Sequence, residues 1–283
     1  EPKTVEPSAK RQVIEVLVHE QQHPVERACR IARLSRAAYY RRPSCRSEKD
    51  VEVIEALNAI VGEHPRWGFW KCFDRLRLQG RPWNHKRVHR VYCQMKLNLP
   101  RRTRRRVPKR IASPLLAPEA HNRIWAADFM HDALYGGRKF RTFNVIDESN
   151  REGLAIEVGT SIPSVRVIRV LERLIDMYGE PEALRIDNGP EFTASTFEDW
   201  CRERGIARLF SQPGKPDQNA FIERFNRTYR NEVLDLYMFE SIEQVQLLSD
   251  EWLTLYNPER PHESLGRVPP LRYLPRPTAF GDS

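Results

Sequence analysis

Apolar residues recur at two different spacings along the chain, and the change of spacing divides it into a front part and a back part. Before residue 100 they recur every three or four positions, which is typical of amphipathic helices. The predicted helices span residues 11–19, 25–32, 36–41, 51–61, 67–79 and 84–96. The first three form a helix-turn-helix outline that many helical hairpins share. The last three, with Asn84 as an expected N-cap, fit a DNA-binding unit and a plain helical bundle equally well.

After residue 123 the pattern becomes one of short strands alternating with helices. Strands are predicted at 124–131, 139–147, 153–158, 183–186 and 206–210. Helices are predicted at 164–178, from Thr193 or Ser195 as a cap to 204, from about 217, and at 242–256. This order predicts an α/β domain with a mixed five-stranded sheet and flanking helices, the order of RNase H-like domains. Small all-α, helix-turn-helix-like units precede it.

These elements predict five segments of the chain. They are a helix-turn-helix-like region (1–46), a three-helix DNA-binding domain (47–99), a basic linker (100–118), an RNase H-like catalytic domain (119–232) and a C-terminal helix with an extension (233–283).

Charge is distributed unevenly between the two parts. Residues 1–118 carry 27 Lys and Arg against 11 Asp and Glu, a net charge of +16, whereas residues 119–283 carry 20 against 27, a net charge of −7. Solvation accounts for any single exposed cation but not for such a surplus, so we expect the front part to bind nucleic acid. The candidate contacts lie on the helix at 84–96 and in the linker: Lys86, Arg87, Arg90, Arg101, Arg102, Arg104, Arg105, Arg106, Lys109 and Arg110.

Composition excludes several classes of protein. The chain has 283 residues, 30% charged and 40% hydrophobic, which is typical of a globular protein with a buried core. No apolar run approaches the roughly 18–20 residues of a membrane span, and no signal-peptide pattern opens the chain. The five cysteines include no Cys-x-x-Cys pair, so we expect a reducing cytoplasm and no disulfide scaffold.

One group of residues has the types, but not the spacing, of a zinc site. Cys72, His85, His89 and Cys93 include a His-x3-His spacing but lack the closely spaced cysteine pair of structural zinc sites. We therefore expect them to lie on two helices of the small domain without a metal.

Three acidic residues stand out by their placement. Asp128 lies in the middle of a predicted strand, where a charged side chain is costly unless it has a function. Asp187 ends a strand, at the position where α/β sheets place ligands, and Glu223 lies on the polar side of the helix that begins near 217. Any one of them alone is more simply a surface or capping carboxylate. Three neighbouring acids compete for the first position: Asp132, Asp147 and Glu148.

Three carboxylates from separate elements suit a pair of Mg²⁺ ions. Such oxygen ligands leave part of the Mg²⁺ coordination open to water and phosphate. Two ions about 3.5–4 Å apart can activate an attacking oxygen and stabilise a leaving one in an in-line displacement. Asp128, Asp187 and Glu223 are therefore candidate catalytic metal ligands, with Mn²⁺ able to replace Mg²⁺, and the choice among the acids competing for the first position stays open.

Three stretches of sequence point to a known family. RIDNGPEF (185–192), QPGKPDQNAFIERFNRTYRNE (212–232) and YNPERPHESLG (256–266) are similar to motifs of the Asp-Asp-Glu transposases of the large bacterial insertion-sequence family made from two overlapping reading frames. More distantly, the chain resembles retroviral integrases. A common family variant has His-Ser before the second Asp and Asp-Asn in the loop, where this chain has Arg185-Ile186 and Gln218-Asn219.

The resemblance implies the same three metal ligands and a DNA contact at Arg230, seven residues after Glu223. It also implies double-stranded DNA as partner, both the terminal inverted repeats of the element and the target, and a homo-oligomer on that DNA. An upstream helix-turn-helix frame as fusion or partner fits a start at Glu1 instead of Met. Further candidate DNA contacts are Arg227, Lys215 and Asn219, and His262 is expected to be structural or DNA-contacting.

We therefore predict a bacterial, nucleoid-associated transposase. It would cleave a phosphodiester at each element end with water and then use the freed 3′-OH to attack another DNA phosphate. Two alternatives stay open. A DNA-binding regulator with an idle RNase H-like domain would be favoured by the loss of one of the three acids. A nuclease of the same fold would cut DNA without joining it, and strand-transfer products would distinguish the two enzymes.

Overall fold

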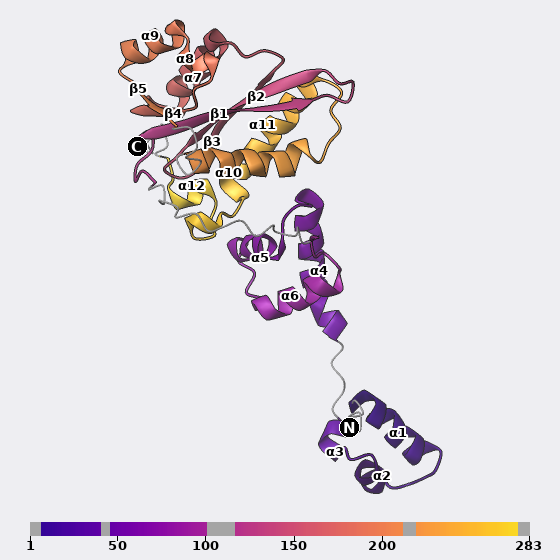
Figure 1. The fold of residues 1–283 in the computed structure, drawn as a ribbon. Helices are drawn as coiled ribbons and strands as arrows, with labels where there is room; N and C mark the ends of the chain where they lie inside the picture. The colour runs from indigo at the N-terminus through magenta and orange to yellow at the C-terminus, as the bar shows by residue number, and fades with distance from the viewer. Residues whose placement is uncertain (1–6, 41–45, 101–116, 212–218, 277–283) are drawn as a thin grey trace, which may run out of the picture. The chain divides into compact units, whose positions relative to one another are not determined.

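The structure is a computed structural model that describes residues 7–40, 46–100, 117–211 and 219–276 (Figure 1). Two units separate by their internal contacts, Glu1–Glu52 and Val53–Ser283. The seven linker cations predicted to contact DNA, together with Lys215, lie outside the described residues. Within the described ranges, no helix combines the length and apolarity that crossing a bilayer requires.

The first unit contains three short helices where the apolar spacing predicts them. They are α1 (Pro7–His19), α2 (Val25–Ile31) and α3 (Arg36–Tyr40). Arg33, with a φ of 51°, makes the break between α2 and α3. The helices share a small core that buries Ile14, Ala28 and Cys29.

A second helical bundle follows, with a core of its own. It contains α4 (Arg46–Glu63), α5 (Phe69–Leu78) and α6 (His85–Gln94). Its largest buried side chains are Leu57, Trp67, Leu76 and Tyr92. The side chain of Asn84 accepts a 2.9 Å hydrogen bond from the backbone N of Lys86, which confirms the predicted cap of α6.

The four candidate zinc residues lie on two helices of this bundle. Cys72 is buried on α5, whereas His85, His89 and Cys93 lie on α6. Sγ of Cys93 lies 3.7 Å from Nε2 of His89, within one turn of the same helix. Cys72 therefore packs in the core of the bundle, whereas His85, His89 and Cys93 lie together on α6.

Five strands form one mixed sheet in the order β3-β2-β1-β4-β5 (Figure 1). The strands are β1 (Ile124–Ala133), β2 (Lys139–Asp147), β3 (Gly153–Gly159), β4 (Ala183–Ile186) and β5 (Ala207–Phe210). The first three pair antiparallel, and β4 runs parallel to both β1 and β5. This is the predicted RNase H-like arrangement.

Helices cover both faces of this sheet. On one face lie α7 (Ser164–Tyr178), α8 (Pro190–Thr193) and α9 (Ser195–Arg204). On the other lie α10 (Ala220–Tyr229), the π-helical η2 (Arg230–Leu234) and α11 (Ile242–Glu259). Successive residues of β1 alternate between the faces: Trp125 and Ala127 join the first core, whereas Ala126 and Met130 join the second.

The cap predicted for the helix ending at Arg204 is wrong in detail. The N-cap position of α9 is Ala194, and no side chain caps it. The hydroxyl of Thr193 instead donates to the carbonyl oxygen of Gly189 at 3.2 Å, inside the short helix α8. Thr193, which was expected to cap the helix that ends at Arg204, therefore lies in an additional short helix, α8.

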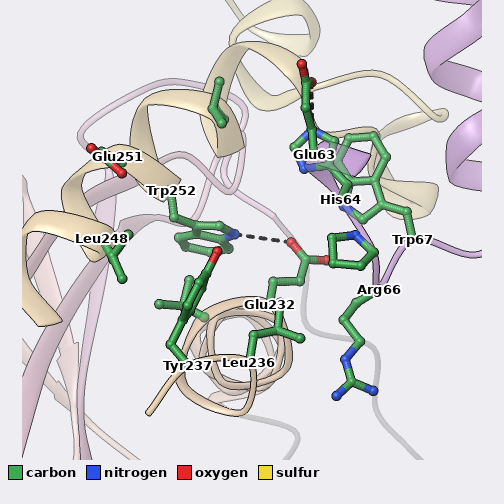
Figure 2. A pocket seen from close by; sticks show the side chains of 13 residues that line it. Glu63, His64, Arg66, Trp67, Glu232, Leu236, Tyr237, Leu248, Glu251 and Trp252 are labelled. Atoms are coloured by element: carbon green, nitrogen blue, oxygen red, sulfur yellow. Dashed lines mark hydrogen bonds and ion pairs between the residues drawn. The ribbon is translucent and has the colours of Figure 1, made fainter. Parts of the chain in front are cut away.

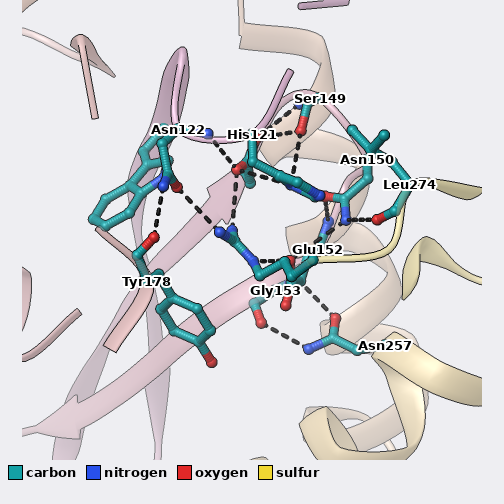
Figure 3. A network of polar contacts seen from close by, with 12 residues as sticks. His121, Asn122, Ser149, Asn150, Glu152, Gly153, Tyr178, Asn257 and Leu274 are labelled. Carbon is teal, nitrogen blue, oxygen red and sulfur yellow. Dashed lines mark hydrogen bonds and ion pairs between the residues drawn. The ribbon is translucent and has the colours of Figure 1, made fainter. Parts of the chain in front are cut away.

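The C-terminal segment packs on the buried turn between β2 and β3. This segment contains η3 (Glu263–Leu265) and α12 (Pro270–Tyr273). Beyond α12, the guanidinium of Arg276 pairs with Asp147 at 3.1 Å and with Glu152 at 2.7 Å, and both carboxylates are almost fully buried (Figure 3). The last described residue thus anchors the C-terminal segment to the sheet.

Candidate catalytic site

Asp128 lies in the middle of β1, on the face that α10 covers. Its Oδ1 accepts a 2.8 Å hydrogen bond from the backbone N of Phe129, and its Oδ2 accepts one of 2.8 Å from Nδ2 of Asn226. Burial, together with the charges of Asp187 and Glu223, raises the pKa of the Asp128 carboxyl to about 6, although these hydrogen bonds act in the opposite direction. Asp128 is therefore a carboxylate in a position where a negative charge is disfavoured.

Asp187 lies beside Asp128 because β1 and β4 are parallel neighbours. Ala126 pairs with Arg185 in this ladder, and Asp187 directly follows the end of β4. The charge of Asp187 acts on Asp128, so the two carboxylates lie close together. The backbone N of Gly189 donates to Oδ1 of Asp187 at 3.0 Å, which fixes this carboxylate at the strand end.

Glu223 lies in the first turn of α10. The helix packs its apolar side on the sheet through Ile222, Phe225 and Tyr229, all buried, which turns the opposite side outward. Asn226, one turn after Glu223, reaches Asp128, so this stretch of α10 lies against the middle of β1. The structure thus brings the three predicted acids to one region, where both other charges act on Asp128.

Each of the three competing acids is paired with an arginine. Asp147 is fully buried and accepts hydrogen bonds from Asn122 and Ser149 besides its pair with Arg276 (Figure 3). Glu148 is also fully buried and pairs with Arg185 at 2.7 Å. Asp132, the third, pairs with Arg230 at 2.8 Å. All three carboxylates are neutralised by arginines.

Two asparagines belong to the site although the sequence analysis did not single them out. Asn226 accepts a 2.7 Å hydrogen bond at Oδ1 from Nδ2 of Asn144, which lies directly opposite Asp128 on β2. The resulting chain runs from Asn144 through Asn226 to Asp128. The sequence signal for Asn226 is its position one turn after Glu223, whereas Asn144 gives none without the strand register.

A fourth carboxylate lies next to Asp187. A Cβ added at Gly189 would lie 2.9 Å from Oδ1 of Asp187 and 3.3 Å from Oε2 of Glu191, so both carboxylates flank this glycine. Glu191 pairs with Arg141, whose guanidinium lies 4.1 Å from the centre of the Phe129 ring. The hydrogen bond from Arg141 lowers the pKa of Glu191, although burial acts in the opposite direction.

The candidate DNA contacts differ in exposure. Arg230 is half-exposed, pairs with Asp132 and donates to the carbonyl oxygen of His131 at 2.9 Å. Arg227 is exposed on α10, and Asn219 is buried with an Oδ1 that has no partner among the described residues. On α6, Lys86 is exposed, and Arg87 and Arg90 are partly exposed.

Comparison with known proteins assigns the two parts of the chain. The family described as "Integrase core domain" matches residues 118–216 and, through a second profile with the same description, residues 204–270. The family described as "HTH-like domain" matches residues 48–106. A 39.2 kDa protein of insertion element IS476 from Xanthomonas euvesicatoria is 35% identical over 275 residues, which are 96% of this chain and 78% of the relative.

The chain belongs to the insertion-element transposases of the retroviral integrase superfamily. A 31.7 kDa protein of insertion element IS407 from Burkholderia multivorans is 33% identical to this transposase over 258 residues, which are 91% of this chain and 92% of that one. Among solved structures, the catalytic core domain of HTLV-2 integrase in complex with magnesium is 20% identical, with a TM-score of 0.42, and the match covers 55% of this chain and 96% of that chain.

Proposed function

We propose that this transposase cleaves phosphodiester bonds at the ends of its element and joins the freed 3′-OH ends to target DNA. The observation that carries the proposal is the convergence of Asp128, Asp187 and Glu223 from two parallel strands and one helix, where the charges of the other two raise the pKa of Asp128. A site that gathers like charges is typical of carboxylates that act on a cationic partner.

The donor set fits a divalent metal. Asp128, Asp187 and Glu223 would hold Mg²⁺ or Mn²⁺, which when bound supplies a Lewis acid for the scissile phosphate and for the attacking oxygen. Within the described residues, no three His, Cys, Asp or Glu side chains already surround one point closely enough to hold an ion. We infer that the site is completed when metal and DNA bind together.

The remaining residues of the site have supporting roles. Asn226 holds Asp128 in one orientation, and Gly189 leaves room for the Asp187 carboxylate. Arg230 and Arg227 would contact the bound strand beside the acids, while the basic front part would hold the duplex. The substrates would be the terminal inverted repeats and a target duplex, bound by a homo-oligomer, with an upstream helix-turn-helix frame as fusion or partner.

The test is strand transfer in Mg²⁺ on element-end duplexes, both intact and pre-cleaved. Asp128→Asn, Asp187→Asn and Glu223→Gln are each expected to abolish cleavage and joining with DNA binding retained. Asp176→Asn, on the exposed side of α7, is the matched control and should behave as wild type. Any of the three variants with near-normal joining would remove that residue from the mechanism.

The same assay separates the two alternative functions. A wild-type chain that cuts but leaves no joined product would be a nuclease. A chain that binds the ends and does neither in Mg²⁺ or Mn²⁺ would be a regulator.

A further inference from the structure

A polar pocket lies beside α10. Its volume is about 510 Å³. It is lined by the outward side of α10, by the C-terminal segment around His262, and by residues of the second helical bundle. None of the proposed metal ligands belongs to its wall.

Cations dominate the wall of this pocket. It contains Arg66, Lys71, Arg224, Arg227 and Arg260, against two carboxylates, Glu232 and Glu263. Pro100 also lines the pocket, and the sequence continues from there as RRTRRR. The pocket is therefore strongly positive, which favours an anionic ligand.

The buried carboxylate in the wall of the pocket, that of Glu232, is already paired. Glu232 accepts hydrogen bonds from Nε and Nη2 of Arg260 at 3.0 and 2.8 Å. It also accepts one of 3.2 Å from Nε1 of Trp252, which Figure 2 shows from the side of a neighbouring pocket. Lys71 approaches the same carboxylate only at 3.4 Å. Because one carboxylate balances one charge, Arg260 satisfies Glu232 and leaves the charge of Lys71 in excess.

Three other cations of the pocket lack a partner in the part of the chain that the structure describes. Arg66, Arg224 and Arg227 are exposed, and among the described residues none of their guanidinium groups forms an ion pair or a hydrogen bond. Burial, together with the charge of Arg260, lowers the pKa of Lys71 to about 8. An anion placed among these groups would relieve both the repulsion between them and the cost of the buried charge.

We propose that this pocket binds a phosphate group of the DNA backbone through Arg66, Lys71 and Arg224, which rests on the proposed function because DNA is the ligand. Arg224 follows Glu223 directly on α10, so the same helix carries a proposed metal ligand and a residue of the pocket.

The test uses the full chain with Arg66→Ala and Arg224→Ala combined. Binding of a fluorescent duplex without divalent metal is followed by anisotropy at several salt concentrations. Because each phosphate contact contributes about 0.9 to the slope of log affinity against log salt, the double variant should bind more weakly with a slope shallower by about 1–2. The double variant Arg66→Lys, Arg224→Lys should recover part of the affinity and part of the slope.

The matched control removes two exposed arginines from the opposite face of the sheet, Arg169 on α7 and Arg202 on α9. It should retain the wild-type slope. A thermal melt of each variant excludes unfolding as the cause, and the Arg66→Gln, Arg224→Gln pair keeps the apolar stems if the alanines destabilise the chain.

Three outcomes would overturn the assignment. If the wild type binds DNA normally and the double variant has the same slope, the assignment of the pocket is wrong and the proposed function is unaffected. A wild-type chain without salt-dependent DNA binding overturns the proposed function together with the pocket. Stabilisation of the wild type by millimolar inorganic phosphate, lost in the double variant while DNA binding is unaffected, would identify a small-anion site.

Discussion

Nδ2 of Asn226 donates a 2.8 Å hydrogen bond to Oδ2 of Asp128, and this bond ties α10 to the centre of the sheet. Asn226 is held in turn by Asn144, so its amide cannot rotate without breaking one of the two bonds. Asp128 consequently presents its carboxylate in one orientation. The same bond places the first turn of α10, with Glu223, on the side of the sheet to which Asp128 projects.

Removal of this amide should therefore weaken the chemistry more than the fold. Asn226→Ala is expected to lower strand transfer about 10–100-fold, which is the usual cost of losing a residue that orients a metal ligand. Asn226→Asp should lose more, because it sets a second negative charge against Asp128. The measurement is strand transfer on pre-cleaved ends at increasing Mn²⁺, which should partly restore Asn226→Ala. Wild-type activity in that variant would make the bond incidental.

Substitution of Arg230 tests whether strand transfer requires its positive charge. It pairs with Asp132 at 2.8 Å and with Asp235 at 3.9 Å, and such half-exposed pairs contribute at most about 1 kcal/mol to stability. We expect Arg230→Ala to lower strand transfer without unfolding the domain and Arg230→Lys to keep part of the activity. Joining at the wild-type rate by the Ala variant would show that Arg230 serves only the surface pair. A large fall in melting temperature would make it structural.

Arg276 should matter for stability more than any exposed arginine of the C-terminal segment. Its guanidinium lies between Asp147 and Glu152, which are 0% and 4% exposed in their side chains. Arg276→Ala leaves two buried charges without their partner, so we expect the free energy of unfolding to fall by about 3 kcal/mol. The exposed Arg272→Ala is the control and should cost under about 0.5 kcal/mol. Equal losses in urea denaturation would contradict the anchoring role.

The sequence predicted the sheet and its helices well because each element has one buried face. The alternation along β1 and the apolar stripe of α7 are local signals, and the bounds of β2, β4 and α7 agree with the structure residue for residue. Asp128 could be singled out because it interrupts an apolar strand, and Asp187 because it ends one. Glu223 lies on the polar side of its helix, and the resemblance to the transposase family implied its role.

The contacts between these elements could not be predicted in the same way. Asn144 meets Asn226 only through the register of β1 and β2 and the rotation of α10. Asp147 was a rival candidate for the metal site because the sequence around it gives no sign that it is buried. Its partner Arg276 lies 129 residues further along the chain, so the pair could not be predicted either. Gln218-Asn219 leads into α10, yet the burial of Asn219 depends on how that helix packs.

His262 gives the stability of the folded chain a pH dependence of known sign. It is buried next to the cationic pocket, and its Nε2 has no hydrogen-bond partner among the described residues. Burial, together with the charges of Arg260 and Lys71, lowers its pKa to about 2, and the charge of Glu232 acts in the opposite direction. The folded state therefore favours the neutral ring.

In the unfolded chain the same ring takes up a proton below its ordinary pKa of about 6.5. Between pH 6.5 and 2 the unfolded state thus binds one more proton, so the free energy of unfolding should fall as the pH falls, by up to about 1.4 kcal/mol per unit from this residue. It should be unaffected above pH 6.5. Urea denaturation at pH 8, 7, 6 and 5 checks this with His262→Gln, whose stability curve should be flatter below pH 6.5 and parallel to wild type above it. A constant offset between the two curves at all four pH values would show that His262 titrates alike in both states.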